Sequence, residues 1–582
     1  MQRWFAWSML IHVLVGAACG PAGSVAPGLM PHAGPRTPLE MEFEREAEAF
    51  YWAYFDFRPA MGISLGHHRY DGQLPDRSPQ AIASEMARLH RARKAFERFP
   101  PEKLSAMARV EHAVIMQEIR KELFDLEVMR SPWRNPRYYL EALDLSPYIS
   151  RDYRPIEERA LAIIHACRAA SAYLGQARLN LEDRVPLPWL ETTLAQVAGA
   201  TDFVRVDIPK AMASVTEEPL ARDLAQALAS MAEELTDFER FLGSRRSAAT
   251  SDFALGEDRF LRMLSETQGL TIRLADLKRI ASADLDRNLR AMKEAARSID
   301  AKKSMRGVVL EAAEVRPAPG EVLELATRQA QEARQFLVEK DLVTIPSEDL
   351  AEVQESPPFM RWNAAFLSAA GVFETKRLSS FYYISPPDPS WSKEEQTAYL
   401  IPRADLLFTT IHELWPGHFL QSLHSKRNPS RILKSFCTYS NEEGWAHYAE
   451  EMAWNAGMGH GDPRLRVGQL KEALLRNARF LVAIGLHAER MTVEQATSLF
   501  QDKAFVDPAN ARQQAMRGTF DPMYVSYTLG KLMIMKLYED WRNATGKRGA
   551  LKEFHDAFLS HGCAPIPVIR QAMLGPGSGP AL

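Results

Sequence analysis

The chain is poor in several features that mark whole classes of protein. Its 582 residues include only four cysteines, so no disulfide framework is implied. It has no dense run of lysine and arginine and a net charge of −3, which argues against nucleic acid as a partner. Internal repeats and low-complexity tracts are also absent. What remains, 46% hydrophobic and 25% charged residues, is ordinary for a soluble globular protein.

The first residues are predicted to be a targeting segment. Arg3 precedes an apolar run, Trp4–Val15, which is too short to span a bilayer and is followed by small residues up to position 18. This pattern is typical of a secretory signal peptide, residues 1–18. Cys19, directly after it, resembles a bacterial lipoprotein cleavage site, although Gly16 stands where leucine is usual. We expect an exported protein: a cell-envelope lipoprotein lipidated on Cys19, or a secreted or periplasmic protein. An uncleaved apolar start is the third alternative.

The residues after the signal peptide form a separate segment. Residues 19–38 are rich in glycine and proline and are predicted to be a flexible tether. The other cysteines, Cys167, Cys437 and Cys563, lie far apart in the sequence. One disulfide among them is compatible with an oxidising compartment, and three buried thiols are equally compatible.

Most of the mature chain has the apolar periodicity of helices, so the predicted fold class is mainly α. The N-terminal part shows it over Leu39–Phe57, Pro79–Phe99, Pro101–Val128, Ile156–Leu181, Leu220–Leu242, Ile272–Ile299 and Pro319–Leu342. The C-terminal part shows it over 395–424, 433–456, 463–490, 493–504, 520–542 and 549–560. We place a domain boundary between a helical N-terminal lobe, 39–370, and a catalytic lobe, 371–582.

The segment 343–400 differs from its surroundings in being punctuated by prolines. Within it, Leu378–Ile384 (LSSFYYI) is the best strand candidate, so a small β element is expected near 376–384. A strand beside a metal helix could align a peptide by hydrogen bonding along its edge. The alternative is a hairpin that covers the core.

The stretch HELWPGHFLQ, from His412 to Gln421, begins like a zinc-peptidase helix and then departs from it. In the common H-E-x-x-H motif, two histidines four residues apart face one metal ion. Here the second histidine is His418, and a step of six residues turns a regular helix by ~240°. Either there is no metal site, or the backbone at Pro416-Gly417 is deformed to bring His418 round.

A second segment, NEEGWAHYAEEM, supports a metal site. Zinc peptidases often take a third ligand from a glutamate on a following helix. Glu443 is placed to be that ligand, and Gly444 would allow two helices to approach closely. His447 and Glu450 share its helical face, because they follow it by four and seven residues. A merely solvated charged face is the alternative.

A third segment, DPMYVSYTLGKLMIMKL, places Tyr524 and Tyr527 on a mostly apolar helix. A tyrosine hydroxyl can stabilise the oxyanion that forms during peptide hydrolysis. Taken alone, however, such tyrosines are usually part of the core.

Together these motifs resemble the bacterial domain-of-unknown-function 885 family, which is grouped with the zinc metallopeptidases related to thermolysin and thimet oligopeptidase. HELWPGHFLQ matches H-E-x-x-P-G-H-x-x-Q, EEGWAHYAEEM matches E-G-W-A-x-Y-A-E, and SYTLGKL matches S-Y-x-x-G-x-L. The resemblance implies a large two-lobed helical fold with a deep cleft lined by the metal helices. It also implies that Pro416-Gly417 belongs to the motif.

The resemblance further implies the roles of individual residues. His412, His418 and Glu443 are the expected zinc ligands, Glu413 the general base and Tyr527 the oxyanion donor. The family often has leucine at the position of His447. This histidine could contact one of the zinc-binding residues, contact the substrate, or bind the zinc ion itself in place of another residue. Contacts to a ligand or to the substrate are also expected from Gln421, Glu450, His487 and Tyr524.

The function predicted from the sequence is a zinc-dependent hydrolase, a metallopeptidase that cleaves short peptides by a zinc-activated water. The membrane is contacted only through the N-terminal lipid anchor. Two alternatives stay open: a catalytically inactive lipoprotein that binds metal or peptide, and a zinc hydrolase of a non-peptide amide or ester. A di-metal helical bundle is disfavoured, because no repeated Glu-x-x-His pair accompanies the core motifs.

Overall fold

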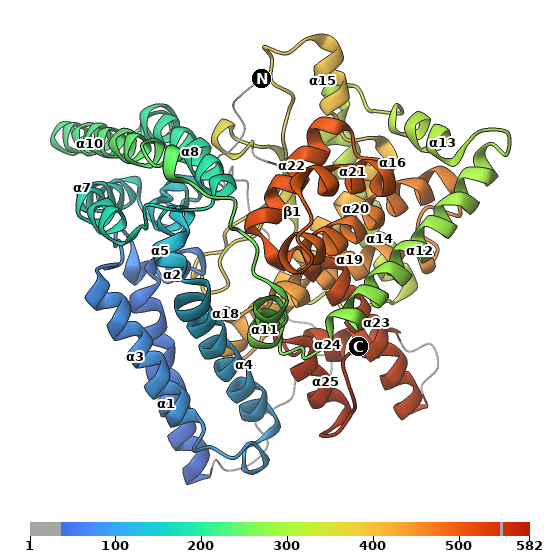
Figure 1. The fold of residues 1–582 in the computed structure, drawn as a ribbon, viewed down its shortest axis with the longest axis horizontal. Coiled ribbons are helices and arrows are strands. Elements are labelled where there is room, and N and C mark those ends of the chain that lie inside the picture. The colour runs from blue at the N-terminus through green and yellow to red at the C-terminus, as the bar shows by residue number, and fades with distance from the viewer. Residues whose placement is uncertain (1–36, 362, 547–550) are drawn as a thin grey trace. The chain divides into compact units, whose positions relative to one another are not determined.

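The computed structural model describes residues 37–361, 363–546 and 551–582. Over these residues the protein is mainly α-helical, as predicted, with a small three-stranded sheet (Figure 1). The predicted signal peptide, Cys19 and almost all of the predicted tether lie outside them. A search of the described helices finds none that is long and apolar enough to cross a membrane.

Contacts between residues divide the chain into two compact units. The first contains the chain up to Ser251 together with 356–363 and 368–381, and the second contains 252–355, 364–367 and 382–582. This division differs from the boundary predicted near residue 370, because the helices between 257 and 340 pack with the C-terminal helices. On α12 (Leu274–Ile299), for example, Asn288 donates a hydrogen bond to Asn477 of α20 (Pro463–Ala488) at 2.7 Å.

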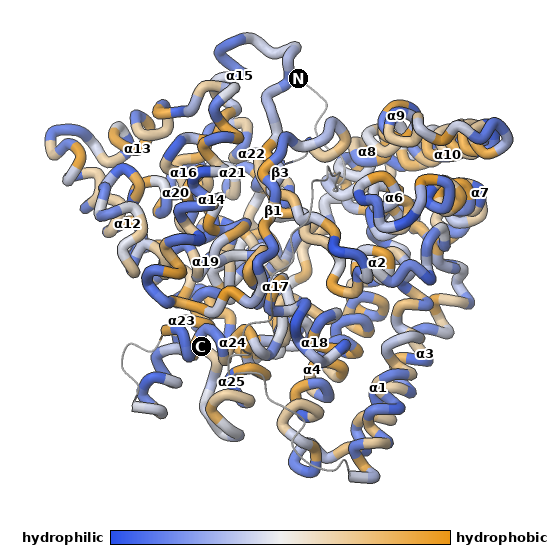
Figure 2. Tube along the Cα trace, turned by 180° about the vertical axis from the view of Figure 1, so that it is seen from behind, coloured by the Kyte–Doolittle hydropathy of each residue, from blue (hydrophilic) through white to orange (hydrophobic). Residues whose placement is uncertain are grey.

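The first unit is built from amphipathic helices. In α10 (Glu218–Gly243) the buried residues recur every three or four positions, from Leu224 through Met231 and Leu235 to Leu242. α10 lies against α7 (Ile156–Asn180) and α8 (Leu187–Asp202), as Figure 1 shows. Hydrophobic and hydrophilic residues alternate along these helices in Figure 2. The other helices are α1 (Pro38–Phe57), α2 (Pro59–Ser64), α3 (Pro79–Phe96), α4 (Ala106–Leu123), α5 (Ser131–Arg134), α6 (Ser146–Ser150) and α9 (Ile208–Ala211).

The second unit holds the remaining helices, and three of its helix pairs position the motifs. α19 (Tyr439–Asn455) packs on α23 (Ser526–Thr545), α12 packs on α20, and α16 (Arg403–Glu413) packs on α20. Around them lie α11 (Glu257–Gln268), α13 (Met305–Ala313), α14 (Val322–Lys340), α15 (Lys393–Tyr399), α17 (His418–Arg427), α18 (Arg431–Ser435), α21 (Val493–Ala504), α22 (Pro508–Phe520), α24 (Leu551–Leu559) and α25 (Ile566–Leu574).

The predicted β element exists as β3 (Ser380–Ile384), all five of whose residues are buried. It forms a sheet of order β1-β3-β2 with β1 (Ala351–Glu355) and β2 (Ala365–Ser368). Because β3 has a strand on each side, it offers no free edge, so alignment of a peptide along β3 is ruled out. The strand instead anchors the sheet to a helix of the motif: the Tyr382 hydroxyl lies 3.3 Å from Thr410 Oγ1 on α16.

The helix predicted over 395–424 is divided into α15, α16 and α17. Pro402 separates the first two, since proline removes a backbone donor and fixes φ. The break between α16 and α17 falls at Pro416-Gly417, inside the His-Glu motif.

Candidate metal centre

The deformation needed to bring His418 round is present in the backbone between α16 and α17. The helix ends at Glu413, the peptide bond between Trp415 and Pro416 is cis, and the Gly417 amide donates to the Ile411 carbonyl at 3.0 Å. The new helix then begins at His418. The indole of Trp445 fixes this turn by donating to the Pro416 carbonyl at 2.8 Å.

Gly417 is required by the closeness of this turn. A Cβ at this position would collide with the His412 carbonyl group and with the Ile411 oxygen. Glycine has no Cβ, so the chain can fold back directly onto the end of α16. The irregular spacing of the motif therefore follows from a tight reversal that only glycine allows here.

Glu443 reaches the same place from α19. A close crossing of α19 and α23 sets the position of this helix, because Gly444 faces Gly530 and a Cβ on either glycine would meet the backbone of the other helix. The close approach predicted from Gly444 is thus made to α23. Two glycines facing each other allow the backbones to approach more closely than side chains would permit.

The three predicted zinc ligands converge in the structure. Glu443 Oε2 lies 3.3 Å from His412 Nε2 and 3.5 Å from His418 Nε2. The two imidazole rings are perpendicular, with centroids 4.8 Å apart. All three ligand atoms lie within 4.8 Å of one another, and no other group of His, Cys, Asp or Glu in the described part of the chain meets this criterion.

The donor set fits a zinc ion. Two imidazole nitrogens and one carboxylate oxygen form the three-ligand set that catalytic zinc sites use, with a further position open for water. Glu443 Oε2 is buried and makes no well-aligned hydrogen bond among the described residues, although the two imidazole nitrogens lie 3.3 and 3.5 Å from it and a buried carboxylate oxygen normally has such a bond. A divalent cation between the three groups would supply the missing partner and would bind both imidazoles in their neutral form.

A buried polar chain lies behind His412. Its Nδ1 donates to Glu450 Oε1 at 2.7 Å, and Arg476 of α20 holds the same oxygen at 3.1 Å. Glu450 is fully buried, and burial raises the pKa of its carboxyl, but Arg476 and then His412 outweigh this effect and hold the pKa well below its usual value. The ionised Glu450 fixes the tautomer of His412, leaving Nε2 free to face the metal position.

His447 lies beside Glu450 and outside the converging group. Its Nδ1 is 3.6 Å from Glu450 Oε2, and neither ring nitrogen has a hydrogen-bond partner among the described residues. Burial first, and then Lys531, lower the pKa of His447 to about 4, so the imidazole is neutral. The geometry gives it contact with Glu450 and no place among the metal ligands.

Glu413 is hydrogen-bonded to the sheet. Its Oε2 accepts a hydrogen bond of 2.7 Å from the Leu367 amide of β2. The side chain is partly exposed, so water can reach it. A carboxylate held in this way has a fixed orientation and a second oxygen that can accept a proton.

Tyr527 lies on α23 close to Glu443. Its hydroxyl accepts a hydrogen bond of 3.2 Å from Tyr439, whose hydroxyl in turn accepts one of 3.0 Å from Arg517. Burial first, and then the charge of Glu443, raise the pKa of Tyr527 to about 12. Tyr527 therefore keeps its proton, and this proton is not used in the bond with Tyr439.

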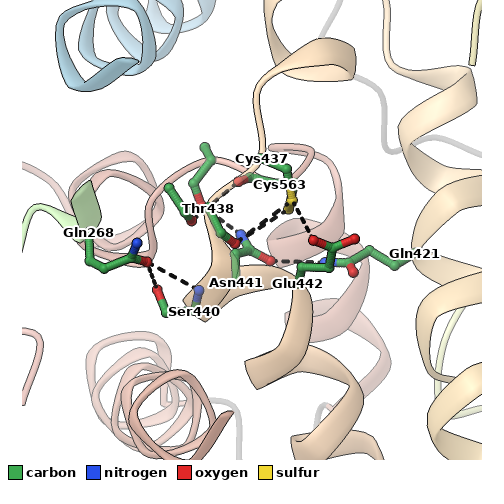
Figure 3. The surroundings of a disulfide bond; sticks show 9 residues. Gln268, Gln421, Cys437, Thr438, Ser440, Asn441, Glu442 and Cys563 are labelled. Carbon is green, nitrogen blue, oxygen red and sulfur yellow. Dashed lines mark hydrogen bonds between the residues drawn. A yellow bond between two sulfur atoms is a disulfide. The ribbon is translucent and has the colours of Figure 1, made fainter. Parts of the chain in front are cut away.

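The other predicted contact residues make hydrogen bonds to groups other than the three ligands. Gln421 joins α17 to α19 by donating to Asn441 Oδ1 at 2.9 Å (Figure 3). Tyr524 donates to Gln514 on α22 at 2.6 Å. The ring of His487 is buried and contacts the rings of Phe253 and Phe260, and its Nε2 donates to the Gly518 carbonyl at 2.7 Å.

A disulfide between Cys437 and Cys563 stabilises the start of the helix that carries Glu443 (Figure 3). It ties the residues just before α19 to the loop between α24 and α25, where the Thr438 amide also donates to the Cys563 carbonyl at 3.1 Å. Cys167 remains a buried thiol. The sequence left this pairing open, because only the fold brings positions 437 and 563 together.

Sequence reasoning missed Arg476, Arg479, Tyr439 and Arg517. A signal existed for the first two: they stand in an otherwise apolar stretch of α20, where buried cations need partners. Nothing comparable marks Tyr439 or Arg517. Their roles depend on packing between helices that are distant in the sequence.

A family model described as a bacterial protein of unknown function, DUF885, matches residues 59–573. A search of curated proteins finds no match. Among solved structures, a candidate lipoprotein of unknown function from Shewanella oneidensis has a TM-score of 0.77 at 23% identity, over 91% of this chain and 99% of its own. A candidate lipoprotein from Colwellia psychrerythraea has the same TM-score at 18% identity, over 91% of this chain and 98% of its own. An M32 carboxypeptidase from Deinococcus radiodurans has a TM-score of 0.40 at 12% identity, over 93% of this chain and 97% of its own. This similarity is too distant to bear on function.

Proposed function

The chain belongs to the DUF885 family of bacterial proteins, and we propose that it is a zinc-dependent metallopeptidase that cleaves short peptides. One observation carries the proposal: His412, His418 and Glu443 offer three ligand atoms within 4.8 Å of one another, although two of them are six residues apart. A glutamate, Glu413, directly follows the first ligand. This combination is typical of zinc peptidases.

His412, His418 and Glu443 would hold the zinc ion. A bound zinc ion supplies a Lewis acid and lowers the pKa of a coordinated water toward ~7. The protein contributes rigidity to this ligand set. Glu450 and Arg476 fix His412, the Gly417 turn fixes His418, and the crossing of α19 with α23 fixes Glu443.

Glu413 is the proposed general base. The Leu367 amide orients its carboxylate by a hydrogen bond of 2.7 Å, which leaves the other oxygen to take a proton from the attacking water. The same carboxyl can then pass that proton to the nitrogen of the leaving amine. A protein that only binds metal or peptide would need no such base. The presence of Glu413 therefore favours an enzyme over an inactive binding protein.

Tyr527 is the proposed oxyanion donor. Its hydroxyl accepts from Tyr439 and is protonated at neutral pH, so its own proton can be donated to the developing negative charge. Removing such a donor from other enzymes costs roughly 2.7–4 kcal/mol of transition-state stabilisation.

We also propose that the protein is exported and acts in the cell envelope. The support is the N-terminal segment with Cys19, together with two similar structures that are described as candidate lipoproteins. Lipidation of Cys19 would then be its attachment to the membrane.

The proposal is tested by comparing the wild type with Glu413→Gln. Both proteins are purified, their zinc content is measured, and a mixture of short peptides is followed by mass spectrometry. We expect both to bind about one zinc ion, and the variant to lose 10²–10⁴-fold in peptide cleavage, as for loss of a general base. Cleavage by Glu413→Gln at the wild-type rate would contradict the proposed mechanism. Zinc-loaded wild type that cleaves no peptide would favour a binding protein or a hydrolase of other amides and esters.

A further inference from the structure

An arginine beside Tyr527 has no acidic partner among the described residues. Arg479, on α20, is half-buried, and its Cζ lies 5.0 Å from the ring centroid of Tyr527 and 5.0 Å from that of Tyr524. Its Nε donates to Gln514 Oε1 at 3.0 Å. Over the described chain, its two terminal nitrogens have neither a hydrogen-bond acceptor nor a carboxylate within ion-pair distance.

The neighbouring arginines are neutralised. Arg476 pairs with Glu450 at 3.1 Å and with Glu472 at 2.9 Å, and Arg517 pairs with Asp521 at 3.1 Å. Among the arginines that α20 and α22 place around Tyr527, Arg479 is therefore the one whose positive charge is not balanced by a carboxylate of the described residues. A partly buried cation normally has a partner, because desolvation disfavours the isolated charge.

The environment of Arg479 points to the kind of partner. Two tyrosine rings and Gln514 hold the guanidinium in place, so little side-chain freedom is lost when it binds. The two free terminal nitrogens form a planar fork, which matches the two oxygens of a carboxylate. The fixed guanidinium of Arg479 therefore fits a planar anionic group that is part of the substrate.

The position of Arg479 sets where that carboxylate would be. Arg479 stands one helical turn beyond Arg476, which lies 3.3 Å from the ligand His412. The Cζ atoms of both arginines lie within 6 Å of the Tyr527 ring, at 5.8 and 5.0 Å. A carboxylate bound at Arg479 would thus lie beside Tyr527, the proposed oxyanion donor, and we take its separation from the reacting carbonyl to be one or two residues of extended chain, which span roughly 3–7 Å.

We propose that Arg479 binds the C-terminal carboxylate of the peptide, so that the enzyme is a carboxypeptidase that releases one or two residues from that end. This inference rests on the proposed peptidase function. In the reaction the C–N bond next to the C-terminus breaks. The carbonyl carbon gains the hydroxyl of water, and the departing nitrogen gains the proton carried by Glu413.

The test uses the zinc-loaded full chain and three peptides that share one sequence, except that the last residue of the third is changed. The first has a free C-terminal carboxylate, the second a C-terminal amide, and the third a C-terminal amide with an aspartate as its last residue. We expect kcat/KM to favour the free acid over both amides by on the order of 10- to 100-fold, as for loss of a charge-assisted pair. Products should be single residues or dipeptides from the C-terminus.

Two variants connect this preference to the arginine. Arg479→Met should bring the ratio of free acid to amide close to one, and Arg479→Lys should retain part of it, because lysine keeps the charge and loses the fork. Arg464→Met, which changes an exposed arginine of the same helix, should keep the wild-type ratio. Zinc content and thermal unfolding confirm that each variant is folded.

The outcomes separate this inference from the function on which it rests. Zinc-dependent cleavage with equal rates on acid and amide, or an unchanged ratio in Arg479→Met, overturns the carboxylate site and leaves the peptidase standing. A preference for the aspartyl amide over the plain amide that matches the preference for the free acid would reassign Arg479 to acidic side chains and overturn the proposal. Absence of all peptide cleavage overturns both.

Discussion

At the scale of single residues, the metal centre depends on the groups behind its ligands. Glu450 is buried completely, accepts from His412 Nδ1 and is held by Arg476. Its ionised state is stabilised by those partners, so it provides a fixed acceptor that aligns the imidazole. Partners of this kind usually contribute 10- to 100-fold to metal affinity.

We therefore predict that Glu450→Gln weakens zinc binding about 10- to 100-fold. The amide no longer provides a negative charge for the His412 N–H group, so the ring loses its fixed orientation. Competition with a chromogenic chelator measures the affinity. The matched control is Glu472→Gln, which removes the other carboxylate of Arg476 and should change the affinity by less than about threefold. Equal effects of the two substitutions would show that Arg476 acts only through its charge.

At the scale of elements, two glycine contacts bring three helices together. Gly417 lets α17 begin directly against the end of α16, and the facing pair Gly444 and Gly530 lets α19 and α23 cross with their backbones in contact. The first contact positions His418 and the second positions Glu443. Both contacts require the absence of a side chain, so the arrangement of the ligands depends on sterics as much as on chemistry.

We predict that Gly530→Ala destabilises the protein by about 1–3 kcal/mol, as for overpacking in a close-packed core, and lowers zinc affinity. The added Cβ collides with the Ser440 carbonyl and pushes α19 away from α23. Denaturant unfolding and zinc titration measure the two effects. Gly175→Ala is the control: it lies inside α7, nothing stands within 4 Å of its Cβ, and the change should be neutral or stabilise by up to about 1 kcal/mol. Unchanged stability in Gly530→Ala would contradict the close crossing.

Most helices could be predicted from the sequence, whereas the contacts between them could not. Apolar periodicity located α7 and α10 to within about two residues at each end, because each buries one continuous face. The distortion at Pro416-Gly417 could also be stated beforehand, since His418 cannot reach the metal otherwise. Strands β1 and β2 were missed, because AEVQE and AFLS are only five and four residues long, too short for a clear pattern. Tyr439 was missed because its partners, Arg517 and Tyr527, are distant in the sequence.

At the scale of the whole molecule, each of the two units contains its own group of buried or half-buried charged residues. The metal centre and its charged partners lie in the second unit. The first unit holds His68, whose Nδ1 donates to Asp71 at 3.1 Å and whose Nε2 lies 3.0 Å from Glu374, a residue about 300 positions away. Burial lowers the pKa of His68, but the two carboxylates raise it by more than burial lowers it, so that the pKa is about 9.

This arrangement predicts how stability depends on pH. Because the pKa of His68 is higher in the folded state than the ordinary value of 6.5, its contribution is complete below pH 6.5 and is lost as pH rises through about 9. The loss amounts to at most about 3 kcal/mol. Denaturant unfolding at several pH values should show this decline in the wild type and not in His68→Gln. An exposed histidine of the same unit gives the control, His165→Gln, which should follow the wild-type curve. An identical decline in His68→Gln would assign the effect to other groups.

The central claim is that His412, His418 and Glu443 together bind one zinc ion, and a crystal of the zinc-loaded protein tests it most directly. Anomalous diffraction at the zinc absorption edge locates the metal without reference to activity. We predict one peak about 2.0–2.2 Å from His412 Nε2, His418 Nε2 and a carboxylate oxygen of Glu443. A fully loaded crystal without a peak between these atoms, or with the ion at His447 and Glu450, would contradict the account.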